Sequence, residues 1–187
     1  MNVYDFDKTI YDGDSTADFY KFCLKRHKKI ITLAPSLLGS AARFYVFKKG
    51  SKTEFKQVMY RFLRNCDIDR DIADFWEINN AKIKKYYLDQ KKSDDVIISA
   101  SPEFLLEPMI KKLEAGTLIA SRVDKVTGEY SGINCHGEEK VRRFYEEFPN
   151  GRIDSFYSDS YSDTPLAAKA YKAYMVNKDK VSEWVFK

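Results

Sequence analysis

The sequence predicts an α/β protein, a doubly wound parallel sheet with an all-helical segment inserted after the first strand. Three observations lead to this fold class. Short apolar runs of the kind found in buried strands recur along the chain. Helical segments separate most of these runs, and such alternation is typical of a parallel sheet. Residues 15–92 show only the helical spacing of apolar residues, so we expect a helical cap (15–92) on a core formed by residues 1–14 and 93–187.

The first predicted strand ends in two carboxylates. An apolar run leads into Asp5-Phe6-Asp7-Lys8-Thr9, and a turn-rich stretch that ends at Asp14 follows. Open α/β sheets bind their ligands at the carboxyl ends of the strands. We therefore expect the carboxylates of Asp5 and Asp7 to converge at that edge. An acidic turn after an edge strand is the alternative for so short a motif.

The predicted cap contains one long apolar stretch, residues 30–42, which Pro35 and Gly39 interrupt. This stretch is too short to span a bilayer. Its first part, Ile30 to Leu38, directly follows two lysines. We expect it either to pack inside the cap or to rest on an anionic membrane surface.

After the cap the chain alternates between strands and helices. Ser101 is expected to cap a helix that begins at Pro102, with Gly116 as its stop signal. Strands are predicted at residues 96–98, 117–120, 153–157 and 174–176, and further helices at 137–149, after 164, and at the end of the chain over 181–186.

Charge is unevenly distributed along the 187 residues, which carry a net charge of +4. Residues 15–93 hold 18 Lys/Arg and 8 Asp/Glu, or +10, and the remainder holds 14 and 20, or −6. A basic insert that faces an acidic body suits an anionic ligand held between them, with a cation in the acidic cluster. No nucleic-acid-binding motif is recognisable, so a nucleic acid partner is not expected.

The composition and the cysteine content indicate a folded protein in a reducing cellular compartment. A hydrophobic fraction of 44% excludes a disordered chain. The three cysteines are widely spaced and form no C-x-x-C motif, which favours reduced thiols over a disulfide frame or a zinc site. No secretory signal precedes the first strand, so we expect a cytoplasmic location.

Several polar side chains are predicted to share the carboxyl edge of the sheet. They are Asp5 and Asp7, Ser99, Asp159 and Asp163, and Lys140 on a nearby helix. Carboxylates gathered in this way raise one another's pKa unless a cation lies among them. Oxygen-only ligands favour Mg²⁺, which shares its coordination with a phosphate. Lys140 and Ser99 would then hold phosphoryl oxygens, and a carboxylate in line with the phosphorus would be a nucleophile.

This ordered set of motifs resembles the haloacid dehalogenase (HAD) superfamily of phosphohydrolases. It is most similar to the phosphoserine-phosphatase-like branch, whose helical cap is inserted after the first motif (subfamily IB type). The resemblance covers nearly the whole chain and implies a Rossmann-like core. The motifs are Asp5-x-Asp7-x-Thr9, Asp12-Gly13-Asp14-Ser15, Ser99-Ala100-Ser101-Pro102, Gly137-Glu138-Glu139-Lys140 and Ser158-Asp159-Ser160-x-x-Asp163.

The resemblance implies a role for each matched residue. Asp5 would attack phosphorus, and Asp7 would protonate the leaving oxygen and then activate water. Mg²⁺ would be held by Asp5, Asp7, Asp159 and Asp163, with Asp7 contributing its backbone carbonyl. Ser99 and Lys140 would act in catalysis and hold the phosphate, and substrate binding would involve Thr9, Asp14, Ser99, Ala100 and Lys140. Arg61 and Arg64 are candidates for a substrate carboxylate, and His136 either borders the site or is an ordinary loop histidine.

We therefore expect a Mg²⁺-dependent phosphomonoester hydrolase that acts through an aspartyl-phosphate on a small phosphorylated metabolite. The basic insert and the stretch Ile30 to Leu38 motivate an alternative, a phosphatidylglycerophosphatase-like lipid-phosphate phosphatase at a membrane surface. Two further alternatives are a phosphotransferase and a non-catalytic protein that binds a phosphorylated ligand.

Overall fold

The core is a six-stranded sheet with the strand order β3-β2-β1-β4-β5-β6 in the computed structural model, which describes residues 1–186. The first five strands along the chain run parallel, and β6 pairs antiparallel with β5. The predicted fold class is confirmed, with an antiparallel edge strand that the prediction lacked. The strands are β1 (Asn2–Tyr4), β2 (Val96–Pro102), β3 (Thr117–Ser121), β4 (Ile153–Ser158), β5 (Ala170–Asn177) and β6 (Lys180–Glu183).

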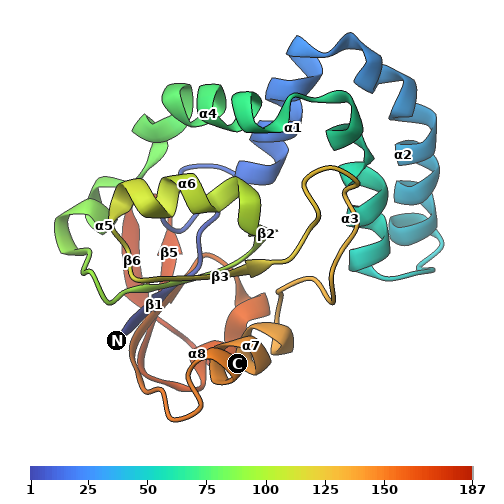
Figure 1. Cartoon of the computed structure of the whole chain (residues 1–187). Helices are drawn as coiled ribbons and strands as arrows, with labels where there is room; N and C mark the ends of the chain where they lie inside the picture. Colours follow the sequence, from blue (N-terminus) through green and yellow to red (C-terminus); the bar gives the residue numbers. More distant parts are fainter. Residues whose placement is uncertain (187) are drawn as a thin grey trace.

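Helices cover both faces of this sheet (Figure 1). Successive strand residues point to opposite faces, so Tyr4 and Ile97 join one apolar cluster and Val3 and Ile98 join another. The first cluster lies under α6 (Glu103–Leu113), and the second packs against α7 (Glu138–Glu147) and α8 (Thr164–Ala167). Two covered faces explain why the central strands are continuous apolar runs.

Between β1 and β2 the described chain forms helices and no strand. The elements of this insert are α1 (Ser15–Arg26), η1 (Lys28–Leu33), α2 (Ala34–Ala41), the π-helix η2 (Ala42–Val46), α3 (Lys52–Tyr60), η3 (Arg61–Asn65), α4 (Ile68–Asn79), η4 (Asn80–Lys82) and α5 (Lys85–Gln90). Its last part packs on the sheet layer, because Tyr87 meets Tyr4 edge to face and Trp76 Nε1 donates to Leu105 O at 2.6 Å. The boundaries of core and cap at residues 14/15 and 92/93 stay a prediction.

Packing inside the cap accounts for only part of the stretch Ile30 to Leu38. Ile30 is buried and Leu33 is half-buried, but Ile31 and Leu38 are 67% and 71% exposed. No helix within residues 1–186 has the length and apolar character needed to cross a bilayer.

The turn from β2 into α6 differs from the prediction. Strand β2 extends through Pro102, which is the N-cap residue of α6, and Ser101 belongs to the strand. Helix α6 ends at Leu113, where the helix was expected to end, but it is stopped by its C-cap residue Glu114, in a left-handed conformation (φ 53°), and not by Gly116. Gly116 instead allows two backbone segments to pack closely, because a Cβ at this position would lie 2.6 Å from the carbonyl oxygen of Ser93.

The prediction of a terminal helix over residues 181–186 is wrong. Strand β5 continues to Asn177, and the chain turns at Lys178 (φ 54°) into the antiparallel strand β6. Trp184 supports this pairing, because its backbone N–H donates to Ala173 O and its ring packs near Phe156. Six residues are too few to stabilise a helix without tertiary contacts, and here those contacts favour a strand.

Candidate active site

The candidate site lies at the topological switch point of the sheet, where the order of the strands reverses at β1. Strand β1 has β2 on one side and β4 on the other, and all three run parallel. Their carboxyl ends therefore meet at one edge, the position at which open α/β sheets bind ligands. Asp5 follows β1 directly, Asp159 follows β4 directly, and Ser99 lies on β2 just before the irregularity in its pairing with β3.

Lys140 joins two of the predicted carboxylates. Its Nζ donates to Asp5 Oδ1 and to Asp163 Oδ2, both at 2.7 Å, and the lysine side chain is only 2% exposed. Burial disfavours its charge, but the two carboxylates outweigh this effect and raise the pKa of Lys140. Burial also raises the pKa of Asp5, and the charge of Lys140 opposes that shift. Helix α7 thus holds a permanent cation against Asp5.

Asp7 is held by donors from two other elements. Ser15 N–H, at the start of α1, donates to Asp7 Oδ1 at 2.6 Å, and the Ser101 hydroxyl on β2 donates to Asp7 Oδ2 at 2.5 Å. Ser101 is itself linked to Thr16 Oγ1 at 2.8 Å. Burial and the charge of Asp14 raise the pKa of Asp7, while the serine hydrogen bonds lower it. A carboxyl with a raised pKa is suited to donate and accept protons near neutral pH.

Thr9 connects the loops that carry Asp5 and Asp159. Its hydroxyl donates to Asp5 Oδ2 at 3.4 Å and accepts from Asp159 N–H at 2.9 Å. The side chain of Thr9 is fully buried. The structure therefore places this predicted substrate-binding residue between the two acidic loops, and Thr9 lines neither of the two cavities that open at this edge of the sheet.

Two adjoining cavities open at this edge. The acidic cleft, of about 180 Å³, is lined by Asp5, Asp7, Lys8, Asp14, Lys52, His136, Lys140, Asp159, Ser160, Ser162 and Asp163. The cap pocket, of about 220 Å³, is lined by Asp7, Asp14, Thr16, Ala17, Tyr45, Lys52, Phe55, Lys56, Met59 and Ser101. Three residues are common to both cavities, so a ligand in the cap pocket has direct access to Asp7.

The donors in the acidic cleft are those that a hard divalent cation prefers. Asp5, Asp159 and Asp163 all line it, and carboxylate oxygens are typical ligands of Mg²⁺. Asp163 Oδ2 accepts from Lys140 and from the Ser158 hydroxyl, but Oδ1 is buried and has no hydrogen-bond partner among residues 1–186. A buried, unpartnered carboxylate oxygen is costly, and a cation would satisfy it. The chemistry of these oxygen donors therefore fits a divalent metal.

A family model described as haloacid dehalogenase-like hydrolase matches residues 3–168. The chain is a member of this hydrolase family. The match spans every residue of the acidic cleft. It confirms the predicted superfamily and the prediction that the chain is a hydrolase.

Known proteins resemble this hydrolase over most of its length. Protein CicA of Caulobacter vibrioides is 27% identical over 95% of this chain and 86% of its own. A probable phosphatase of Mycobacterium tuberculosis is also 27% identical, over 95% and 68%.

Solved structures share the fold at low identity. A protein of unknown function from Bordetella pertussis Tohama I has a TM-score of 0.75 at 17% identity, covering 92% of this chain and 87% of that one. Phosphoserine phosphatase from T. onnurineus has a TM-score of 0.56 at 19% identity, covering 92% and 81%. At such identities these likenesses show the fold alone.

The remaining predicted substrate residues of the hydrolase lie around the cleft in different ways. Asp14 is exposed, lines both cavities and caps α1, with its Oδ1 accepting from Ala17 N–H at 2.9 Å. Ser99 is fully buried, and its hydroxyl accepts from Ser101 N–H at 3.1 Å. Ala100 takes part through its carbonyl oxygen, which accepts from Lys56 Nζ at 2.8 Å.

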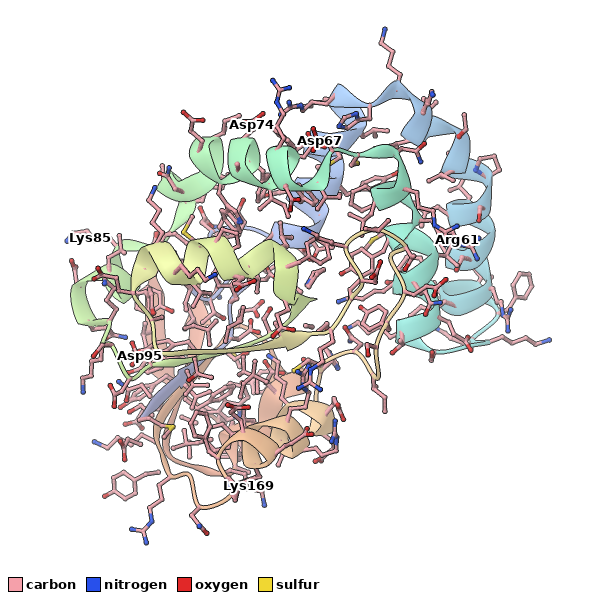
Figure 2. The ribbon with its side chains drawn as sticks, in the orientation of Figure 1. Arg61, Asp67, Asp74, Lys85, Asp95 and Lys169 are labelled. Atoms are coloured by element: carbon pink, nitrogen blue, oxygen red, sulfur yellow. The ribbon has the colours of Figure 1, made fainter. Side chains whose placement is uncertain are left out.

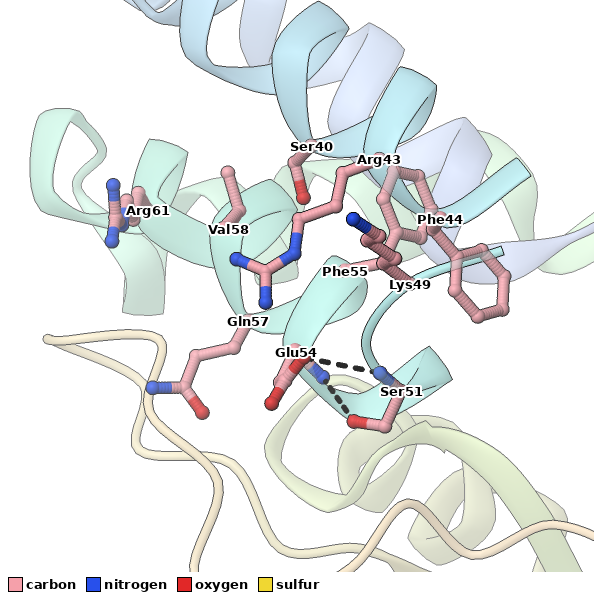
Figure 3. Close-up of a pocket in the computed structure, with 10 residues that line it drawn as sticks. All are labelled: Ser40, Arg43, Phe44, Lys49, Ser51, Glu54, Phe55, Gln57, Val58 and Arg61. Carbon is pink, nitrogen blue, oxygen red and sulfur yellow. Dashed lines mark hydrogen bonds between the residues drawn. The ribbon is translucent and has the colours of Figure 1, made fainter. Parts of the chain in front are cut away.

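Arg61 and Arg64 do not reach the acidic cleft. Arg61 lies on the cap side of the molecule (Figure 2) and lines a separate cavity of about 260 Å³ between α3 and the helix formed by α2 and η2 (Figure 3). Arg64 Nε donates to Thr127 O at 3.2 Å. The structure therefore separates both arginines from the carboxylates that they were expected to accompany.

Two cap lysines, Lys52 and Lys56, lie beside the carboxylates instead of the arginines. The sequence analysis did not single them out. Lys52 and Lys56 lie one turn apart on α3, and both line the cap pocket. Burial lowers the pKa of Lys56 to about 8, and the nearby charge of Lys52 adds to this effect. Residues four apart on a helix lie on the same face, so this pair could have been found from the sequence. The insert contains eighteen basic residues, however, and nothing in the sequence distinguishes this pair from the others. Ser101 was also missed, because its position suggested a helix cap.

Proposed function

We propose that this hydrolase cleaves phosphomonoesters through an aspartyl-phosphate on Asp5, with Mg²⁺ as its cofactor. One observation carries the proposal. Asp5 beside Lys140 and Asp7 beside Ser101 line the same cleft. This arrangement pairs a nucleophile that has a fixed counter-charge with a separate carboxyl group of raised pKa.

Mg²⁺ would be held by the carboxylates of Asp5, Asp159 and Asp163, together with the backbone carbonyl of Asp7. When bound, this ion would neutralise charge on the phosphoryl oxygens. The unpartnered Asp163 Oδ1 supports this assignment. Lys140 lies 2.7 Å from Asp5 and favours its ionised form, which opposes the rise in the pKa of Asp5 that burial causes.

The chemistry at the chain's own residues has two steps. In the first, an Asp5 carboxylate oxygen forms a bond to phosphorus, the bond from phosphorus to the ester oxygen breaks, and Asp7 gives that oxygen a proton. In the second, Asp7 takes a proton from water, the water oxygen attacks phosphorus, and the bond to Asp5 breaks to release phosphate. Ser101 and Ser15 hold Asp7 in one orientation for both proton transfers.

The cap pocket limits the leaving group to a small molecule. Its volume is about 220 Å³, and a phosphoryl group in the acidic cleft would direct the rest of the substrate into it. Lys52 and Lys56 supply positive charge there, while Phe55 and Met59 supply apolar surface. We therefore assign a small phosphorylated metabolite as substrate, with a second anionic group near the lysines.

Replacement of Asp5 by Asn tests the covalent mechanism. An amide is not a nucleophile, so hydrolysis of an aryl phosphate in the presence of Mg²⁺ should fall by about 10³-fold or more. A chelator should abolish the wild-type activity. Acid quenching during turnover should trap phosphate on the peptide that contains Asp5.

Asp12→Asn is the matched control, because Asp12 is an exposed acid in the same loop and does not line the acidic cleft. It should keep the wild-type rate. Undiminished hydrolysis by Asp5→Asn would exclude the covalent route. Addition of small alcohols would show, through transfer products, whether the enzyme is instead a phosphotransferase.

A lipid-phosphate phosphatase is the second candidate function. One observation favours it: Tyr45 lines the cap pocket and is also 56% exposed on the outer surface of the cap. The pocket thus adjoins an apolar surface. Release of phosphate from a short-chain phosphatidylglycerophosphate faster than from soluble metabolites would select this candidate over the first.

A further inference from the structure

The part of the cap most distant from the sheet exposes large apolar side chains. We define the outer cap face as the set Ile31, Leu38, Tyr45, Val46 and Phe47, which are 67%, 71%, 56%, 71% and 66% exposed. Neither α2 nor η2 contains a buried residue. Single exposed apolar residues are ordinary, but five within a stretch of seventeen residues form a surface that calls for a partner.

These side chains come from one contiguous stretch of the chain, η1 and the continuous helix formed by α2 and η2. Leu38 and Tyr45 are seven positions, or about two helical turns, apart on the continuous helix formed by α2 and η2. In Figure 1, α2 is the outermost helix of the cap, and α3 lies between it and the loop that leads to α7. The helix formed by α2 and η2 therefore lies on the outer side of the cap, and of the five side chains only Tyr45 also lines the cap pocket.

Basic residues flank the outer cap face at both of its ends. Lys28 and Lys29 precede Ile31, and Lys48 and Lys49 follow Phe47. From residue 19 to residue 53 the sequence holds nine Lys/Arg and no Asp/Glu. Glu54, at the start of α3, is an acidic residue of the cap beside the helix formed by α2 and η2. Most of the others lie elsewhere, and Figure 2 shows Asp67 and Asp74 along α4, apart from α2.

A capped turn joins the helix formed by α2 and η2 to α3. Ser51 and Glu54 form a capping box at the start of α3, in which each side chain accepts from the other residue's N–H at 3.1 Å (Figure 3). Gly50 has a φ of 86°. Phe47, Lys48 and Lys49 directly precede this turn, at the end of the helix formed by α2 and η2.

From these observations we infer that the outer cap face docks on the surface of an anionic lipid bilayer. Apolar side chains inserted among the acyl chains, with lysines at the level of acidic headgroups, are the combination by which interfacial helices bind membranes. Charge favours this occupant over a second copy of the chain, because two such basic faces would repel each other. The inference does not depend on the proposed catalytic activity.

Vesicle flotation of the full chain tests the inference. Vesicles of phosphatidylcholine with about 30% phosphatidylglycerol should bind the protein at least about 10-fold more tightly than pure phosphatidylcholine vesicles at about 0.1 M salt. Val46→Ser with Phe47→Ser should weaken this binding about 10-fold or more. Lys48→Gln with Lys49→Gln should do the same and should reduce its salt dependence.

Matched controls come from the core. Tyr171 is 85% exposed on β5, and Lys111 and Lys112 are adjacent lysines at the end of α6. Tyr171→Ser, and Lys111→Gln with Lys112→Gln, should leave vesicle binding unchanged. Aryl phosphate hydrolysis should be equal in all the variants, which shows that each one is folded.

Two results would overturn the inference. The first is an absence of binding to anionic vesicles, or binding that survives Val46→Ser with Phe47→Ser. The second is a concentration-dependent dimer, measured by analytical ultracentrifugation, that the same double substitution abolishes while vesicles remain unbound. That outcome would assign the outer cap face to a second copy of the chain.

Discussion

At the scale of single residues, Asp7 depends on a hydroxyl that lies 94 positions further along the chain. The Ser101 Oγ donates to Asp7 Oδ2 at 2.5 Å. This hydrogen bond stabilises the carboxylate form and so opposes the rise in the pKa of Asp7 that burial causes. Ser101 is a positioning residue, since it acts through Asp7.

Ser101→Ala should change the pH dependence of hydrolysis. Loss of the hydrogen bond raises the pKa of Asp7, so this group stays protonated to higher pH and can still donate a proton to the leaving oxygen. The basic limb of the profile of kcat/KM against pH should therefore move upward, and the rate at the optimum should fall by about 10-fold because Asp7 is less well oriented.

Ser101→Thr keeps the hydroxyl and is the control, with a profile expected to match the wild type. A basic limb that stays in place in Ser101→Ala, or moves to lower pH, would contradict the role assigned to Ser101.

At the scale of elements, the C-terminal hairpin shows where local pattern misleads. The apolar residues Val181, Trp184 and Val185 have helical spacing, yet the chain forms β6 and then buries Trp184 to 6% exposure. Strand β5 offers an unpaired edge at this end of the sheet, and β6 pairs with it. Such an edge exists only after the sheet has formed. The pairing of β6 therefore cannot be predicted from residues 181–186 alone.

Trp184→Ala should lower the free energy of unfolding by about 3 kcal/mol, because it leaves a cavity beside Phe156. Chemical denaturation followed by circular dichroism measures this change. Phe186→Ala is the control, since Phe186 is 56% exposed, and it should cost less than about 0.5 kcal/mol. Equal effects of the two substitutions would show that the hairpin contributes little to the core.

At the scale of the whole molecule, negative charge gathers at the carboxyl edge of the sheet and positive charge in the helical insert that faces it. The acidic cleft gathers carboxylates at the sheet edge, and α3 of the basic insert brings Lys52 to the same cleft. Burial raises the pKa of Asp159, with nearby charges of both signs acting on it as well. The folded state therefore holds its acidic residues in a costly arrangement that a divalent cation would relieve.

Mg²⁺ should stabilise the folded hydrolase. Because the ion would bind the assembled carboxylates and not the unfolded chain, differential scanning fluorimetry should show a Tm several degrees higher with Mg²⁺ than with NaCl at equal ionic strength. Asp159→Asn should lose this shift. Without Mg²⁺ it should melt at the same temperature as the wild type or above it, because one repelling charge is gone.

Asp12→Asn is again the control, and it should keep the full response to Mg²⁺. A Tm shift of the same size in Asp159→Asn and in the wild type would show that Mg²⁺ does not bind through Asp159.

The sequence alone was sufficient for the α/β class, the helical insert and most members of the acidic cleft. Strand ends in a parallel sheet share one edge, so Asp5, Asp159 and Lys140 could be brought together from their order in the chain. Only the tertiary structure decided the surroundings of these groups. Ser101 on Asp7, Lys52 and Lys56 in the cap pocket, and β6 on the sheet edge all depend on which elements become neighbours. Local sequence encodes the tendency to form a helix or a strand, whereas contacts between distant segments exist only once the chain has packed.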